Sequence, residues 1–138
     1  MLALEISFRI KSSGISIDPY KSALIALTHD LTEGYIGDLP KYSSSIIDKR
    51  KLEEAPLKEM GPELGLLIEE FLNQSSIESK VAKLSDYLST ALMAREYLKM
   101  GFNVEDILES SVEGAKRIAE ELNVGIDDLL HGLVEGLS

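Results

Sequence analysis

Apolar and polar residues recur along this chain in runs with helical spacing, and the runs are separated by short breaks rich in Gly, Pro and Ser. No stretch alternates Val, Ile or Thr with polar residues, and no Asn-Gly or Asp-Gly pair marks a hairpin turn. The pattern therefore predicts an all-α fold, a bundle of about six to seven helices that forms a single domain over residues 1–138.

Breakers and capping residues set the expected helix bounds. The first helix covers residues 1–11 and ends at a Ser-Ser-Gly break. Asp18 has the position of an N-cap and Pro19 that of a first-turn proline, so a second helix is expected over 19–33. The remaining predicted helices cover residues 41–55, 62–73, 76–100, 104–123 and 125–137.

Two further caps are expected later in the chain. Ser75 and Glu78 have the spacing of a capping box at the start of the helix over 76–100, which Gly101 ends. Asn103 is the expected N-cap of the next helix.

The helix over 76–100 carries small or apolar residues on two sides, which indicates that it packs on both sides. One predicted stripe contains Val81, Leu84, Leu88, Ala91 and Arg95, and the other contains Ala82, Asp86, Ser89 and Met93.

The composition is that of an ordinary soluble domain, with 44% apolar and 28% charged residues in a chain of 138. No apolar run approaches the ~18 residues of a membrane span. Glu5 and Arg9 argue against a signal peptide at the start. Cysteine is absent, which excludes a disulfide framework, a thiol nucleophile and a thiolate metal site. We expect a cytoplasmic protein without a membrane partner.

The net charge of −10 argues against binding of long nucleic acids, because such binding depends on neutralising many phosphates with Lys and Arg. A single nucleotide stays compatible with this charge. The glycines at 34 and 37 lack the Gly-Lys-Ser/Thr ending of a phosphate-binding loop, and no Gly-x-Ser-x-Gly motif is present.

Candidate chemistry first appears near the end of the second predicted helix. His29, Asp30 and Glu33 would share one quadrant of that helix. Imidazole and carboxylate are good ligands for a divalent first-row metal, and a further carboxylate one turn on can orient or deprotonate a water. The alternative is a helix end with a solvated polar edge. The expected apolar stripe of this helix, beside the quadrant, consists of Ala23, Leu24, Leu27 and Leu31.

Asp86 is the second candidate, because it is the only charged residue in the window 84–94. An ionised carboxylate between two packed faces is costly unless it is paired or bound to a metal. The alternative interpretation is an Asp86 that is hydrogen-bonded to Lys83 or to a backbone amide.

These residues form an ordered set: His29-Asp30, then Glu33, then Gly37-Asp38-Leu39-Pro40, then Lys83 and Asp86, with Glu96-Tyr97 before Gly101. The set resembles HD-domain phosphohydrolases, and more narrowly it is similar to their 5′-deoxynucleotidase branch. The resemblance is strongest over residues 1–101 and implies an HD-domain helical bundle.

The resemblance also implies roles for individual residues. His29, Asp30 and Asp86 would bind one divalent metal ion (Mn, Co, Ni, Zn or Mg). Glu33 would be catalytic, orienting or activating the attacking water. Asp38 would be a catalytic and substrate-binding residue that accepts a hydrogen bond from the sugar hydroxyl. The implied reaction hydrolyses a (deoxy)nucleoside 5′-monophosphate to nucleoside and phosphate, and the implied assembly is a homodimer.

One feature of the family has no counterpart in the chain. The family has another histidine ligand and an upstream arginine for the phosphate, and both would fall before Met1. The chain therefore looks like a family member with its first segment missing. Either the true start lies upstream of Met1, or the protein has lost one of the family's four ligands and its phosphate clamp, for which Arg9, Lys41 and Lys83 could compensate. The alternatives are a catalytically silent HD protein that binds a nucleotide or a protein partner, and an acidic helical scaffold.

Overall fold

The computed structural model describes residues 1–31, 61–125 and 127, and this part of the chain contains five α-helices and no strand. The all-α prediction is confirmed. The predicted helix over 41–55 and nearly all of that over 125–137 lie outside the described residues. The helices are α1 (Leu2–Ser12), α2 (Pro19–Thr28), α6 (Pro62–Asn73), α7 (Ile77–Lys99) and α8 (Glu105–Glu121).

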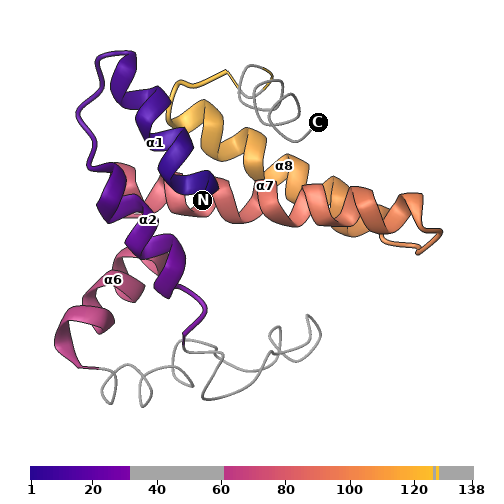
Figure 1. Cartoon of the computed structure of the whole chain (residues 1–138), viewed down its shortest axis with the longest axis horizontal. Helices are drawn as coiled ribbons and strands as arrows, with labels where there is room; N and C mark the ends of the chain where they lie inside the picture. Colours follow the sequence, from indigo (N-terminus) through magenta and orange to yellow (C-terminus); the bar gives the residue numbers. More distant parts are fainter. Residues whose placement is uncertain (32–60, 126, 128–138) are drawn as a thin grey trace.

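Helix α7 is the longest described helix and runs across the whole molecule (Figure 1). Helix α8 returns along it, and the far end of this hairpin projects beyond the other helices. Helices α1, α2 and α6 gather around the N-terminal half of α7. None of the helices described here is both long enough and apolar enough to cross a membrane.

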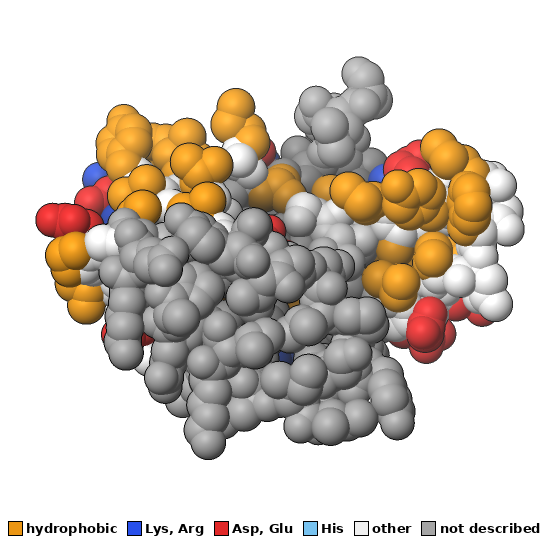
Figure 2. All heavy atoms as spheres, turned by 90° about the horizontal axis from the view of Figure 1, so that it is seen from below, with side chains coloured by type: hydrophobic (Ala, Val, Ile, Leu, Met, Phe, Trp, Pro, Cys, Tyr) orange, Lys and Arg blue, Asp and Glu red, His pale blue; other side chains and the backbone are white. Residues whose placement is uncertain are grey.

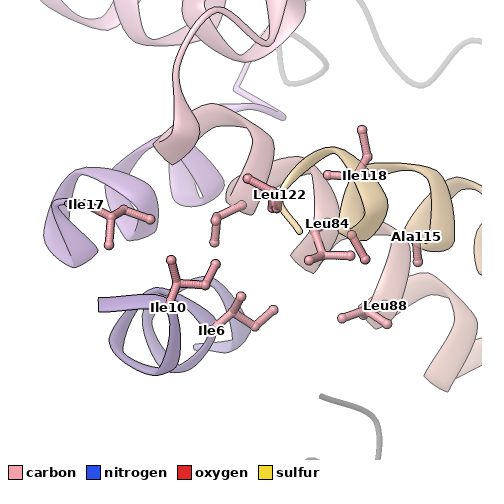
Figure 3. Packing of buried hydrophobic residues seen from close by; sticks show 10 residues of the cluster. Ile6, Ile10, Ile17, Leu84, Leu88, Ala115, Ile118 and Leu122 are labelled. Atoms are coloured by element: carbon pink, nitrogen blue, oxygen red, sulfur yellow. The ribbon is translucent and has the colours of Figure 1, made fainter. Parts of the chain in front are cut away.

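The main hydrophobic core lies between α1, α7 and α8 (Figure 3). Its side chains are almost all aliphatic, and the predicted stripe of α7 from Val81 to Leu88 supplies its centre. The core residues of these helices and their connections are Ile6, Ile10, Ile17, Val81, Leu84, Leu88, Ala115, Ile118, Ala119 and Leu122.

The start of α7 is capped one residue later than expected. Ser76, and not Ser75, is the N-cap: its hydroxyl accepts a hydrogen bond from the Ser79 N–H at 3.0 Å. The Ser79 hydroxyl accepts one in return from the Ser76 N–H at 3.1 Å. Glu78 therefore does not close the capping box. It instead accepts a hydrogen bond from the backbone N–H of Asp18 at 3.0 Å, which joins the start of α2 to the start of α7.

The end of α7 is confirmed at Gly101, whose φ of +89° is strained for a residue with a side chain. The N–H groups of Gly101 and Phe102 bond to the carbonyls of Leu98 and Tyr97, respectively, as in a Schellman motif. The prediction for the next helix was wrong by one residue, because Val104 is the N-cap of α8 and no side chain caps it.

The apolar stripe predicted for α2 was wrong. The face of α2 that is buried carries Ser22, Ile25 and Thr28, whereas Leu27 is 76% exposed. Leu24 and Leu31 are also exposed. A helix that is apolar on most sides does not reveal from its sequence which side its neighbours will cover, and here the small Ser22 lies inside.

Only the first half of α7 is packed on both sides. Ala82, on its second stripe, is fully buried against α2 and α6, and Asp86 is partly buried. Farther along the same stripe Ser89 is exposed and Met93 is 60% exposed. Figure 2 shows hydrophobic side chains gathered where the hairpin projects. The exposed apolar residues of this end are Met93, Tyr97, Met100, Phe102 and Ile107.

Candidate metal centre

The candidate site begins where α2 ends. The sequence predicted a helix through Glu33, but α2 stops at Thr28 and His29 is its C-cap. The backbone of His29 keeps helical dihedrals, and its N–H still donates to the Ile25 carbonyl at 3.0 Å. Asp30 therefore lies just beyond the helix, so its side chain is free of the helical spacing assumed for it.

A hydrogen bond to the backbone of α2 fixes the orientation of the His29 ring. Its Nδ1 lies 2.7 Å from the carbonyl oxygen of Ala26. Because a carbonyl can only accept, Nδ1 must carry a proton. A neutral His29 therefore presents the lone pair of Nε2 on the opposite side, as in many metal-ligating histidines whose other ring nitrogen is bound to a backbone carbonyl.

Two carboxylates face this nitrogen. Asp30 Oδ1 lies 3.0 Å from His29 Nε2, and Asp86 Oδ1, from α7, lies 3.7 Å from it. Carboxylate oxygens are acceptors, so an unprotonated Nε2 would point its lone pair at two groups that can only repel it. The arrangement requires a cation at Nε2, either a proton or a metal ion.

The protonation equilibria agree with this requirement. Burial alone would lower the pKa of His29, but its pairing with Asp86, its bond to Ala26 and the charge of Asp30 together raise that pKa above the usual 6.5. Burial alone would raise the pKa of Asp86, but pairing with His29 and Lys83 lowers it from 3.8 to about 2. Asp86 is therefore ionised at any physiological pH.

Helix α6 forms the wall of the site. The Phe71 ring packs on the His29 ring with a centroid distance of 4.6 Å and a tilt of 40°. Phe71, Ile25 and Ala82 form a small buried cluster directly behind the polar groups. The His29 side chain is only 14% exposed, and among the described residues Phe71 supplies the apolar side of the site.

The second oxygen of Asp86 is taken by Lys83. Lys83 Nζ lies 2.9 Å from Asp86 Oδ2, which matches the alternative that Asp86 is hydrogen-bonded to Lys83. The two interpretations of Asp86 are compatible in this structure, because Lys83 binds one oxygen while the other faces His29.

The donor set fits a divalent metal ion in its chemistry. One imidazole nitrogen and two carboxylates suit Mn, Co, Ni or Zn, and Mg less well. Within the described ranges, no three such side chains already converge in a finished metal site. Asp30 is 65% exposed, whereas Asp86 is bonded to Lys83 and His29 is held by Ala26 and Phe71. The structure thus places the carboxylates of Asp30 and Asp86 near His29 Nε2, and their role as metal ligands stays a prediction.

Two predicted site residues are not placed. Glu33 and Asp38 lie outside the described residues, and their roles stay predictions. Two further residues of the site were not predicted from the sequence: Phe71, which packs on His29, and Ala26, whose carbonyl sets the tautomer. The spacing of Ala26 three residues before His29 was a usable signal, whereas nothing local marks Phe71.

The comparisons with known proteins come from a family model and from solved structures. The model described as "HD domain" matches residues 2–124. A conserved hypothetical protein from Pyrococcus furiosus is 27% identical, with a TM-score of 0.79 over 98% of this chain and 75% of the other. The PH0347 protein from Pyrococcus horikoshii OT3 is also 27% identical, with a TM-score of 0.78 and the same shares covered. No curated protein matches the chain.

Proposed function

Because the chain belongs to the HD domain family, we propose that it is a metal-dependent phosphohydrolase that acts on a (deoxy)nucleoside 5′-monophosphate. HD domains generally are metal-dependent hydrolases. One observation carries the proposal for this chain: His29 Nε2 faces the carboxylates of Asp30 and Asp86, with its other nitrogen bonded to a backbone carbonyl. That geometry is what a cation-binding imidazole needs.

His29, Asp30 and Asp86 are the residues that would hold the metal. A bound divalent ion supplies Lewis-acid stabilisation of charge on the phosphoryl oxygens and makes water more acidic. The chain's own contribution is orientation. The Ala26 carbonyl holds the tautomer of His29, and the Phe71 ring excludes water from one side of it. Because the His29 side chain is already oriented, it would lose little conformational entropy on binding a metal ion and its substrate.

The substrate class rests on the ordered motif in the sequence. Glu33 is proposed to take a proton from the attacking water. The oxygen of that water forms a bond to phosphorus and the bond from phosphorus to the ester oxygen breaks. The ester oxygen takes up a proton, so that nucleoside and phosphate are released. Asp38 is proposed to accept a hydrogen bond from a sugar hydroxyl.

We also propose that the protein works as a homodimer. The exposed face of α2 carries Tyr20, Leu24 and Leu27, and apolar side chains on a helix surface are suited to an interface. Light scattering at micromolar concentration tests this proposal, and a monomeric mass would contradict it.

The activity test is release of inorganic phosphate from a panel of nucleoside 5′-monophosphates, with each divalent metal in turn. We expect turnover with at least one metal, loss of turnover with a chelator, and loss with Glu33→Ala while metal stays bound. An equally active Glu33→Ala variant would refute the proposed role of Glu33. Nucleotide binding without turnover would instead favour the catalytically silent HD protein.

A further inference from the structure

Lys83 is held in one place by three neighbours. Its ammonium lies 4.9 Å from the centroid of the Phe71 ring and 4.9 Å from that of the Tyr87 ring. The same ammonium lies 2.9 Å from Asp86 Oδ2. Two aromatic faces and one carboxylate are the partners that a partly buried lysine needs, and each attracts its positive charge.

Helix α8 fixes one of these neighbours. A Cβ atom added to Gly114 would lie 2.6 Å from two carbon atoms of the Tyr87 ring. The ring therefore lies directly on the backbone of α8, where only a glycine leaves room for it. Phe71 comes from α6, so the position of Lys83 depends on side chains or backbone of α6, α7 and α8 together.

We propose that Lys83 is a positioning residue for the metal centre, which limits Asp86 to one ligating oxygen and weakens the hold of the site on its metal ion. The inference rests on the proposed function, because it assumes a metal at His29. The bond from Lys83 to Oδ2 leaves Oδ1 as the oxygen that faces His29. A fixed positive charge beside a ligand also repels a divalent cation.

The described contacts of Lys83 are all with groups of the protein. One of its three donors is directed to Asp86, and two aromatic rings flank the ammonium group. We therefore assign Lys83 first to Asp86.

The test measures Mn²⁺ affinity by isothermal titration calorimetry in the parent chain and in Lys83→Met, Lys83→Arg and Lys80→Met. Lys83→Met should bind Mn²⁺ about tenfold more tightly, because it removes a positive charge beside the ligand and frees Oδ2 of Asp86. Lys83→Arg keeps the charge and the donor and should bind no more tightly than the parent chain. Lys80→Met removes an equal charge from the same helix, where Lys80 pairs with Glu121 at 2.8 Å, and should stay within about twofold.

A second readout follows the coordination itself. The visible absorption of bound Co²⁺ weakens as its coordination number rises, so Lys83→Met should absorb less if Asp86 then binds through both oxygens. A purely structural role would lower stability and weaken binding, which is the opposite sign.

The outcomes are distinguishable. Equal or weaker Mn²⁺ binding by Lys83→Met, or equal tightening by Lys80→Met, would overturn the role of Lys83 alone. No metal binding by the parent chain would remove the proposed function and this inference with it. If circular dichroism shows that Lys83→Met does not fold, Lys83→Arg decides: tighter Mn²⁺ binding by that variant overturns the inference, and binding no tighter than the parent supports it.

Discussion

The two faces of helix α7 pack against different helices and carry different kinds of side chain. One face places Val81, Leu84 and Leu88 in a core of aliphatic side chains shared with α1 and α8. The other places Ala82 and Asp86 against α2 and α6, where a small apolar cluster supports charged groups. The first face contributes stability by burying apolar surface. The second depends on ion pairs and hydrogen bonds between specific atoms.

We infer from this difference that one face of α7 mainly stabilises the fold and that the other mainly serves the proposed metal site. Substitutions on the core face should change the free energy of unfolding and leave the metal affinity almost unchanged. Substitutions on the site face should do the reverse.

The largest effect is expected for Leu84→Ala. This fully buried side chain leaves a cavity in the core, and such truncations cost about 2–5 kcal/mol of unfolding free energy. Urea unfolding measures the loss, and calorimetry with Mn²⁺ should give the parent affinity. Met93→Ala, on the exposed part of the same helix, is the control and should change stability by about 0.5 kcal/mol or less. A large loss of metal affinity in folded Leu84→Ala would contradict the division.

The mirror experiment is Asp86→Asn. The amide keeps the shape of the side chain but removes the charge that faces His29, so we expect at least ~100-fold weaker Mn²⁺ binding, equivalent to about 2.8 kcal/mol. The unfolding free energy should fall by less than that, because the aliphatic core is untouched. Unchanged metal affinity would exclude Asp86 as a ligand.

Gly114→Ala tests whether the Tyr87 ring of α7 is coupled to the backbone of α8. The new methyl group displaces the Tyr87 ring, and overpacking of this kind costs about 1–3 kcal/mol, partly offset by the ~1 kcal/mol advantage of Ala in a helix. A net loss of roughly 1 kcal/mol in urea unfolding is expected. The double variant Gly114→Ala/Tyr87→Leu should show less than the sum of the two single losses, and additive losses would mean that the ring and the glycine are not coupled.

The smallest expected effect is on the pH dependence of the unfolding free energy. Burial alone would raise the pKa of Glu70, but the ion pair with Lys21, whose Nζ lies 2.7 Å from Glu70 Oε1, and the nearby Ser76 lower it below the usual 4.5. A lowered pKa gives stability that is present above pH 4.5 and lost as the pH falls through the folded value. Glu70→Gln should therefore reduce the stability difference between pH 7 and pH 3 by up to about 1 kcal/mol.

The control for the acid experiment is Glu121→Gln. Glu121 pairs with Lys80 at the surface, and its removal should alter the pH dependence much less. An equal effect of both variants would mean that the Lys21–Glu70 pair, which joins α2 to α6, stabilises the fold no more than a surface ion pair does.

Local sequence signals predicted much of the fold. Asp18 caps α2 through the N–H groups of Tyr20 and Lys21, as expected of an aspartate before a proline. Gly61 and Gly101 stand at the predicted breaks with positive φ, because glycine adopts that conformation without strain. The core stripe from Val81 to Leu88 was also readable from its spacing. These features depend on residues within one or two turns of each other.

Other features depend on neighbours far along the chain. The end of α2 at Thr28, and the burial of Ser22 in preference to Leu27, were not predictable from the helix alone. Both faces of α2 offer apolar residues, so packing against α1 and α7 made the choice. The capping box at Ser76 was shifted for a similar reason, since Glu78 is used by Asp18.

The sequence by itself determined the helical class, the breaks between helices and the presence of a histidine-aspartate pair with a distant aspartate. Only the tertiary structure decided that Asp86 meets His29, that Phe71 forms the wall behind them, and that Lys83 holds the second oxygen of Asp86. The physical reason is the distance along the chain over which each kind of interaction acts. Capping and backbone preference act between adjacent residues, whereas the pairing of charges and the covering of a helix face require elements that only folding brings together.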